Sequence, residues 1–311
     1  MRRAIVLGLV AAGVLPGVAS AHVGRTLPVA TNFTARVTVP VAGIEAKVAD
    51  GDQSLWLRVR GSAVVGVPGI LGEPLLRFDA RGVWLNLRSP TAQSDRIDRT
   101  ELRPSASGRP PLWHRVTSGH AYLWHEHRLH ALEPVGGGQW SVPVVLDGRR
   151  RTLGGVLDHH DAGAVWAWIA VPVVLALAAA VAATRSAAAL AALALVATAA
   201  VWAIRVGREL YGRPAVPLAG WIEIAITCVI GALFVFGLTR RNAGTRAFTA
   251  FFVGFGALYE GLTMLPVLTH AIALNALPST AARVVEAVVV AAGIGTLGGS
   301  VVRPLLEGEP A

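Results

Sequence analysis

The chain has 311 residues, of which 53% are hydrophobic and only 15% charged, and its mean hydropathy is +0.54. This composition excludes an ordinary soluble globular protein and indicates a membrane protein that carries a soluble portion. The net charge of +9 comes from scattered arginines, without a basic stripe interleaved with aromatic residues, so nucleic acid is not an expected partner. Cys228 is the only cysteine, which excludes an intramolecular disulfide and a CxxC site.

Residues 1–21 have the pattern of a signal peptide. The segment MRRAIVLGLVAAGVLPGVASAH begins with two arginines, continues as a short apolar run and ends in small residues that a signal peptidase accepts. Cleavage after Ala21 would leave His22 as the new amino terminus. We therefore expect the following part of the chain to be exported.

Residues 22–162 are expected to form an extracytoplasmic all-β, sandwich-like domain. The segments FTARVTV, SLWLRVR, PLLRFDA and GVWLNLR mostly alternate apolar with polar side chains, as half-buried strands do. The segment WSVPVVLDGRRRTLGGVLD predicts a hairpin with Asp147-Gly148 in a type I′ turn. Residues 88–111 are polar and rich in proline, and we expect them to form a long loop.

Residues 163–304 predict a bundle of five transmembrane helices, over residues 164–183, 187–206, 216–238, 247–269 and 284–302. Each run reaches the roughly 20 apolar residues that cross about 30 Å of hydrocarbon. The connections expected on the inner side of the membrane carry slightly more arginine than those on the outer side. Together with the signal peptide, this bias predicts that residues 305–311 form a cytoplasmic tail. The sequence thus predicts a multi-pass protein of the cell membrane, with the lipid bilayer as its main partner.

A histidine cluster is the main functional signal. The segment AYLWHEHRLHAL, residues 121–132, contains His125, His127 and His130. On a strand, His125 and His127 would point to one face with Cα atoms roughly 6.5–7 Å apart, and His130 would need a bend to join them. His120 and the terminal His22 are further candidate ligands. A site made of imidazoles without cysteine suits copper or zinc. Copper is favoured because it has the highest affinity in the Irving–Williams order, and zinc is the alternative.

Other interpretations of the cluster stay open. One alternative is that protonation of the imidazoles senses pH. In another, on the strand interpretation, Glu126 and Arg128 would pair with neighbouring strands, while the histidines would bind carbonyl groups or water. The protein would then be a structural or adaptor protein with an envelope partner. An enzyme is not expected, because the sequence has no GxSxG, HExxH or phosphate-loop motif.

Three segments carry a family resemblance: GIEAKVADGDQSLWLRV, GEPLLRFDARGVWLNLRSPTA and AYLWHEHRLHAL. Over about residues 40–160 the chain resembles a group of uncharacterised actinobacterial proteins that are exported, membrane-anchored and marked by a WH[DE]HRxH motif. Ala131 departs from the aromatic residue usual in that group. The resemblance implies an exported, membrane-anchored protein and does not indicate an activity. The terminal His22 is also similar to that of β-sandwich copper-resistance carriers.

A polar cluster is predicted inside the outer half of the membrane bundle. Ionisable groups there are costly and need partners. We expect ion pairs of Arg205 or Arg208 with Glu223 and Glu260 to lock the helices together. The alternative is a polar pocket for an ion or proton, but the inner half of the spans has no charged groups to continue a path. The cluster comprises Arg205, Arg208, Glu223, Glu260, His270 and Glu286.

Overall fold

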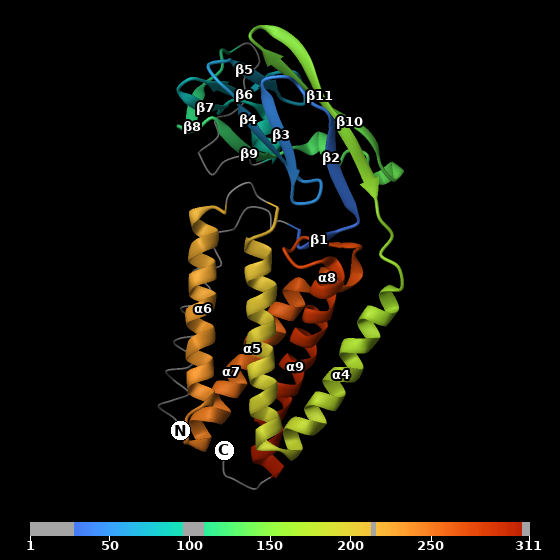
Figure 1. Ribbon diagram of the computed structural model, residues 1–311, viewed down its shortest axis with the longest axis vertical. Coiled ribbons are helices and arrows are strands. Elements are labelled where there is room, and N and C mark those ends of the chain that lie inside the picture. The colour runs from blue at the N-terminus through green and yellow to red at the C-terminus, as the bar shows by residue number, and fades with distance from the viewer. Residues whose placement is uncertain (1–27, 96–108, 213–215, 307–311) are drawn as a thin grey trace.

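The computed structural model describes residues 28–95, 109–212 and 216–306, with a β-rich half above a helical half (Figure 1). The predicted signal peptide, His22 and residues 307–311 lie outside the described residues. Within those ranges, the order of elements is the predicted one, with strands first and long helices after them.

The β-rich half contains two larger sheets in which every strand pairing is antiparallel. The seven-stranded sheet has the order β2 (Phe33–Val39), β11 (Arg149–His159), β10 (Gly138–Leu146), β5 (Val65–Pro68), β6 (Pro74–Asp79), β7 (Gly82–Asn86) and β8 (Trp113–Thr117). The three-stranded sheet has the order β3 (Ile44–Ala49), β4 (Ser54–Val59) and β9 (Ala121–His125). The four segments predicted as strands from their alternation are confirmed as β2, β4, β6 and β7.

The predicted hairpin is confirmed as β10 and β11. Its turn residues Asp147 and Gly148 both have positive φ, 47° and 79°, as a type I′ turn requires. The Asp147 carboxylate also accepts a hydrogen bond from the Val64 amide at 2.9 Å, which ties the turn to the start of β5.

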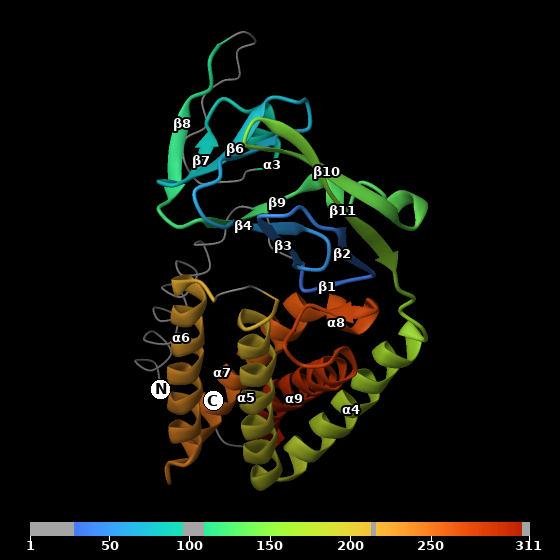
Figure 2. The same ribbon diagram turned by 45° about the horizontal axis from the view of Figure 1, so that its top comes forward.

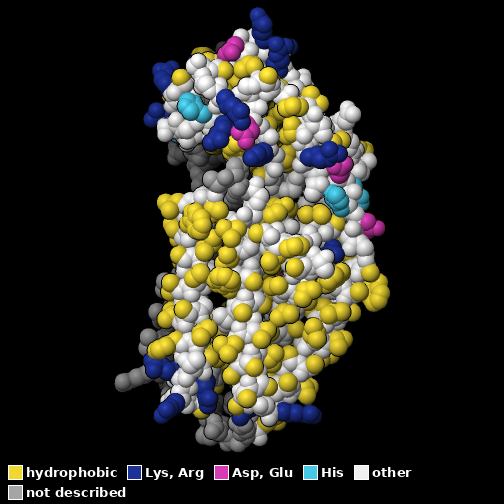
Figure 3. All heavy atoms as spheres, viewed as in Figure 1, with side chains coloured by type: hydrophobic (Ala, Val, Ile, Leu, Met, Phe, Trp, Pro, Cys, Tyr) yellow, Lys and Arg dark blue, Asp and Glu magenta, His cyan; other side chains and the backbone are white. Residues whose placement is uncertain are grey.

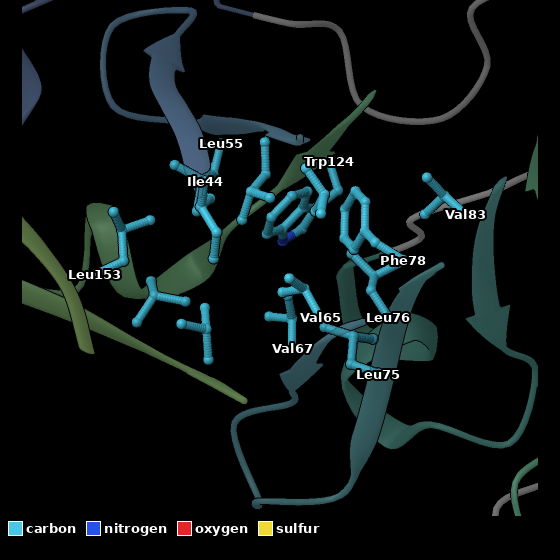
Figure 4. Packing of buried hydrophobic residues seen from close by; sticks show 14 of the residues in the cluster. Ile44, Leu55, Val65, Val67, Leu75, Leu76, Phe78, Val83, Trp124 and Leu153 are labelled. Atoms are coloured by element: carbon cyan, nitrogen blue, oxygen red, sulfur yellow. The ribbon is translucent and has the colours of Figure 1, made fainter. Parts of the chain in front are cut away.

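Both larger sheets contribute side chains to one buried core. Leu55 and Leu57 of β4 and Trp124 of β9 meet residues such as Val65 and Phe78 from the seven-stranded sheet (Figure 4). All five are at most 2% exposed, so the two sheets are held together by close apolar packing.

The segment predicted as an irregular loop, residues 88–111, begins with a short helix, α3 (Pro90–Asp95). The hydroxyl of Ser89 accepts a hydrogen bond from the Ala92 amide, as an N-cap residue does. The Glu73 carboxylate accepts hydrogen bonds from the Ser89 hydroxyl at 2.6 Å and the Thr91 amide at 3.1 Å. Sequence alternation does not reveal such capping, so the helix was missed.

Glu73→Gln is expected to lower the free energy of unfolding by about 1 kcal/mol at pH 7, the usual contribution of a hydrogen bond. Burial alone would raise the pKa of Glu73, but hydrogen bonds from Ser89 and Thr91 outweigh it and lower the pKa below 4.5. The stabilisation is therefore present above this value and disappears in acid. Thermal unfolding of the full-length protein in detergent at pH 7 and about pH 3.5 tests this, and an equal deficit at both pH values would contradict it.

Five long apolar helices form the other half, and their length and composition show a membrane protein. They are α4 (Val165–Arg185), α5 (Ala187–Glu209), α6 (Leu218–Leu238), α7 (Ala243–Met264) and α9 (Ser279–Leu306). Hydrophobic side chains cover the visible face of this half (Figure 3). The fourth predicted span is wrong at its end: α7 stops at Met264, and Pro266 begins a separate short helix, α8 (Pro266–Thr269), because proline cannot donate to the preceding turn.

Pairing between two short strands joins the two halves. The sequence did not predict this contact. β1 (Ala30–Thr31) pairs with β12 (Ile272–Ala273), which lies between α8 and α9 in the chain. Figure 2 shows β1 beside α8, at the end of the helices. Asn32 extends this contact, because its side-chain oxygen accepts a hydrogen bond from the Ala271 amide at 2.8 Å. The β-rich half is therefore seated on one end of the helices as well as connected to α4 by the chain.

Candidate metal centre

The histidine segment does not continue as the predicted strand. β9 ends at His125, and His127–Leu129 form a 3-10 turn, η2. The prediction that His125 and His127 share a strand face is therefore wrong. Glu126 stops the strand, because its side chain accepts a hydrogen bond from the Arg128 amide at 3.2 Å and so caps the turn.

The turn brings His125, His127 and His130 together. One ligand nitrogen of each lies within 4.8 Å of the others, and the ring centroids of His125 and His130 are 5.0 Å apart. His130 Nε2 and His127 Nδ1 are 3.0 Å apart and share a hydrogen. Two nitrogens bound at 2.0–2.1 Å to a tetrahedral ion would be about 3.3 Å apart. Only small ring movements thus separate this arrangement from a three-histidine site.

A buried ion pair within the histidine segment holds the turn in place. Arg128 donates to both Glu126 oxygens, from Nε at 2.6 Å and from Nη2 at 2.7 Å, and Trp124 Nε1 donates to Glu126 at 3.1 Å. Glu126 is 1% exposed and Leu129 is fully buried. The expected pairing of Glu126 and Arg128 with neighbouring strands is therefore wrong: the two residues bind each other. Short charge-assisted bonds of this kind fix the backbone from which the three imidazoles project.

The other histidines of the described chain lie elsewhere. His120 is in the turn before β9, at the opposite end of that strand from His125, and does not belong to the group. His114 lies on β8. His160 Nε2 is 2.7 Å from the Thr34 hydroxyl, and the His159 ring packs 4.8 Å from Phe33. Of the five proposed metal ligands, the structure thus brings three together, separates His120 from them and does not describe His22.

The predicted polar cluster lies at the end of the helices nearer the β-rich half. Arg205 Nε is 3.1 Å from Glu260 Oε2, which links α5 to α7 as one of the expected ion pairs. Arg208 Nη1 approaches Met264 Sδ at 3.9 Å. Glu286 is fully buried on α9, and Glu223 is partly buried on α6. His270 departs from this group, since it follows α8 and lines a pocket between the two halves.

Comparison of the chain with protein-family models, curated protein sequences and solved structures finds no match. Functional assignment therefore depends on the geometry of the site itself.

Proposed function

We propose that this is an integral membrane protein whose exported β-rich domain binds a divalent metal ion through His125, His127 and His130. The observation that carries the proposal is the convergence of three imidazoles on one turn whose backbone is fixed by a buried ion pair. Three nitrogen ligands leave one position of a tetrahedral ion open to water or to an incoming ligand.

Copper is the first candidate ion and zinc the second. Imidazole suits both ions, and affinity for divalent first-row metals is highest for copper. A binding role is favoured over an enzymatic one, because the carboxylate within the histidine segment, Glu126, is buried and bound to Arg128 and Trp124. A general base needs to reach the metal-bound water, which this carboxylate cannot do.

We infer that the β-rich half lies outside the cell and the carboxyl terminus in the cytoplasm. Arginines support this orientation, because they occur where helices end away from the β-rich half: Arg185 ends α4 and Arg303 lies in the last turn of α9. Figure 3 shows basic side chains at that end of the molecule. Such a bias is typical of the cytoplasmic side. On its motifs alone, we also assign the chain to the exported actinobacterial group that it resembles.

Metal titration of the full-length protein in detergent tests the proposal. His125→Ala combined with His127→Ala is expected to weaken Cu²⁺ and Zn²⁺ binding at this site by at least about 100-fold, since losing even a supporting residue costs about 10- to 100-fold. His114→Ala, on exposed β8, is the control and should bind as the wild type does. Unchanged affinity in the double variant would refute the site and favour the structural or adaptor role.

A further inference from the structure

The outer face of the seven-stranded sheet gathers arginines that are far apart in the sequence. Strand pairing aligns six residues in one row: Arg150 of β11, Val145 of β10, Gly66 of β5, Arg77 of β6, Trp84 of β7 and Arg115 of β8. Residues paired directly across strands lie on the same face of a sheet. Adjacent strands are about 4.8 Å apart, so this arginine row extends over roughly 24 Å.

The arginine row faces solvent on the side away from the membrane half. Phe78 and Leu85, each next in sequence to a member of the row, are at most 1% exposed and belong to the core, so alternation turns the row outward. Arg115 and Arg150 are exposed, and the side chain of Arg77 is 42% exposed. Figure 2 shows the three-stranded sheet between β6 and the helices, so the row is not directed toward the bilayer.

Positive charge dominates around the row. Three further exposed arginines flank it: Arg81, Arg149 and Arg151. Figure 3 shows basic side chains gathered at this end of the molecule. Within residues 28–95, 109–212 and 216–306, neither Arg115 nor Arg150 forms an ion pair. Asp79, which pairs with Arg77 at 3.3 Å, is itself buried, so it does not offset the charge at the surface.

A pocket of about 400 Å³ opens on the row where Gly66 and Arg77 are paired. Its walls are mainly apolar and include Val64, Val145 and the Trp113 side chain of β8, while Arg77 is the only charged residue in its lining. Apolar walls with one directed polar group are typical of sites for organic ligands. A simple inorganic anion has no use for such walls, so the pocket indicates an organic anion.

The length of the row indicates a polymer. Arg150 lies three strands and Arg115 two strands from Arg77, which corresponds to about 14 Å and 10 Å along the sheet. One small anion cannot reach all three guanidinium groups. Each guanidinium can bind a carboxylate or phosphate group through two parallel hydrogen bonds. A chain that carries such groups at intervals matches the row.

The sheet face favours a saccharide over a polypeptide. Sheets usually bind extended peptides at an edge, where backbone groups are unpaired. The strands around the pocket, β10, β5 and β6, have a neighbour on both sides, so side chains alone contact a ligand here. Trp84 and Trp113 are partly exposed, and indole rings offer flat apolar surface against which the C–H faces of sugar rings pack.

We propose that the arginine row binds an acidic polysaccharide, with one sugar unit in the pocket beside Trp113 and its acidic group on Arg77. Arg115 and Arg150 bind acidic groups farther along the same chain. The face shares no residue with the histidine turn, so this inference goes beyond metal binding and does not depend on it.

Calorimetric titration of the full-length protein in detergent with polygalacturonate oligomers tests the proposal. EDTA is present, so that no metal ion links the ligand to the histidine turn. Replacing all three arginines, with Arg77→Gln, Arg115→Gln and Arg150→Gln, should weaken binding by at least about 10-fold, the loss expected for one charge-assisted hydrogen bond. Arg115→Gln with Arg150→Gln alone should act in the same direction and leaves the pair of Arg77 and Asp79 intact, which guards against misfolding of the triple variant.

A charge-matched control separates the row from general attraction by a basic protein. The control variant combines Arg36→Gln, Arg58→Gln and Arg60→Gln, which remove equal charge from positions paired with Asp158 or Glu45. It should bind nearly as the wild type does.

Polyglutamate of matched charge and Trp113→Ala distinguish a saccharide from a polypeptide. Trp113→Ala should weaken polygalacturonate binding, and polyglutamate should bind the wild type more weakly than polygalacturonate does. The proposal is overturned if both arginine variants bind polygalacturonate as the wild type does, or if the control variant loses as much affinity as they do. Polyglutamate binding at least as tight as that of polygalacturonate would also overturn it, in favour of an acidic polypeptide.

Discussion

Glu126→Ala is expected to abolish metal binding at the histidine turn although it changes none of the three histidines. The Glu126 carboxylate is the common partner of the Arg128 guanidinium, the Arg128 amide and the Trp124 indole, so its removal releases the cap of η2. Arg128, whose side chain is 17% exposed, would be left largely buried without a counter-charge. Breaking such a pair from one side costs about 3–5 kcal/mol.

Urea unfolding followed by tryptophan fluorescence, together with zinc titration, measures both effects in the full-length protein. Replacing both members, with Glu126→Leu and Arg128→Met, should recover part of the lost stability, because no charge is then left buried alone. Glu45→Ala, which breaks surface ion pairs on β3, should change stability far less than Glu126→Ala does, because solvent screens exposed pairs. If Glu126→Ala retains wild-type stability and zinc affinity, the ion pair does not hold the turn.

Gly254→Ala is expected to destabilise the membrane half strongly. A Cβ atom at Gly254 of α7 would lie 2.5 Å from the backbone nitrogen of Leu297 and 2.8 Å from its Cα, both on α9. The approach is reciprocal, because a Cβ atom at Gly293 of α9 would lie 2.9 Å from the backbone nitrogen of Leu258 on α7. Backbone atoms cannot move aside as a flexible side chain can, so the two helices must separate. Small residues allow such close contact in membranes, and overpacking there costs about 1–3 kcal/mol or more.

Gly256→Ala on the same helix is the matched control. A Cβ atom at Gly256 has no neighbour within 4 Å, so this substitution should leave thermal stability unchanged or raise it slightly, since alanine is the better helix former. Thermal unfolding of both variants in the same detergent compares them directly. Equal melting temperatures for Gly254→Ala and Gly256→Ala would show that α7 and α9 are not packed as closely as described.

Much of the fold follows from two periodic signals in the sequence. Alternation of apolar and polar residues predicted the strands of the β-rich half, and Asp147-Gly148 marked the hairpin turn. Long apolar runs predicted the five helices. Hydropathy extended the fourth run past Pro266, where the absent amide hydrogen ends α7. β1 and β12 have two residues each, which is too short for any periodic pattern.

The sequence predicted which histidines form the site better than it predicted the local structure that brings them together. Histidine density singled out His125, His127 and His130, but strand geometry was the wrong reason for their convergence. The turn depends on the capping carboxylate of Glu126 and on the burial of Leu129, neither of which has a periodic signal. His120 was included because it is close in sequence, yet it precedes β9 while His125 is the last residue of that strand.

X-ray absorption at the zinc edge tests the central claim most directly. The sample is the full-length protein loaded with one equivalent of Zn²⁺. The predicted spectrum has three imidazole nitrogens at about 2.0–2.1 Å and one oxygen ligand from water. A first shell of oxygen atoms alone, without the outer-shell scattering of imidazole rings, would contradict the account.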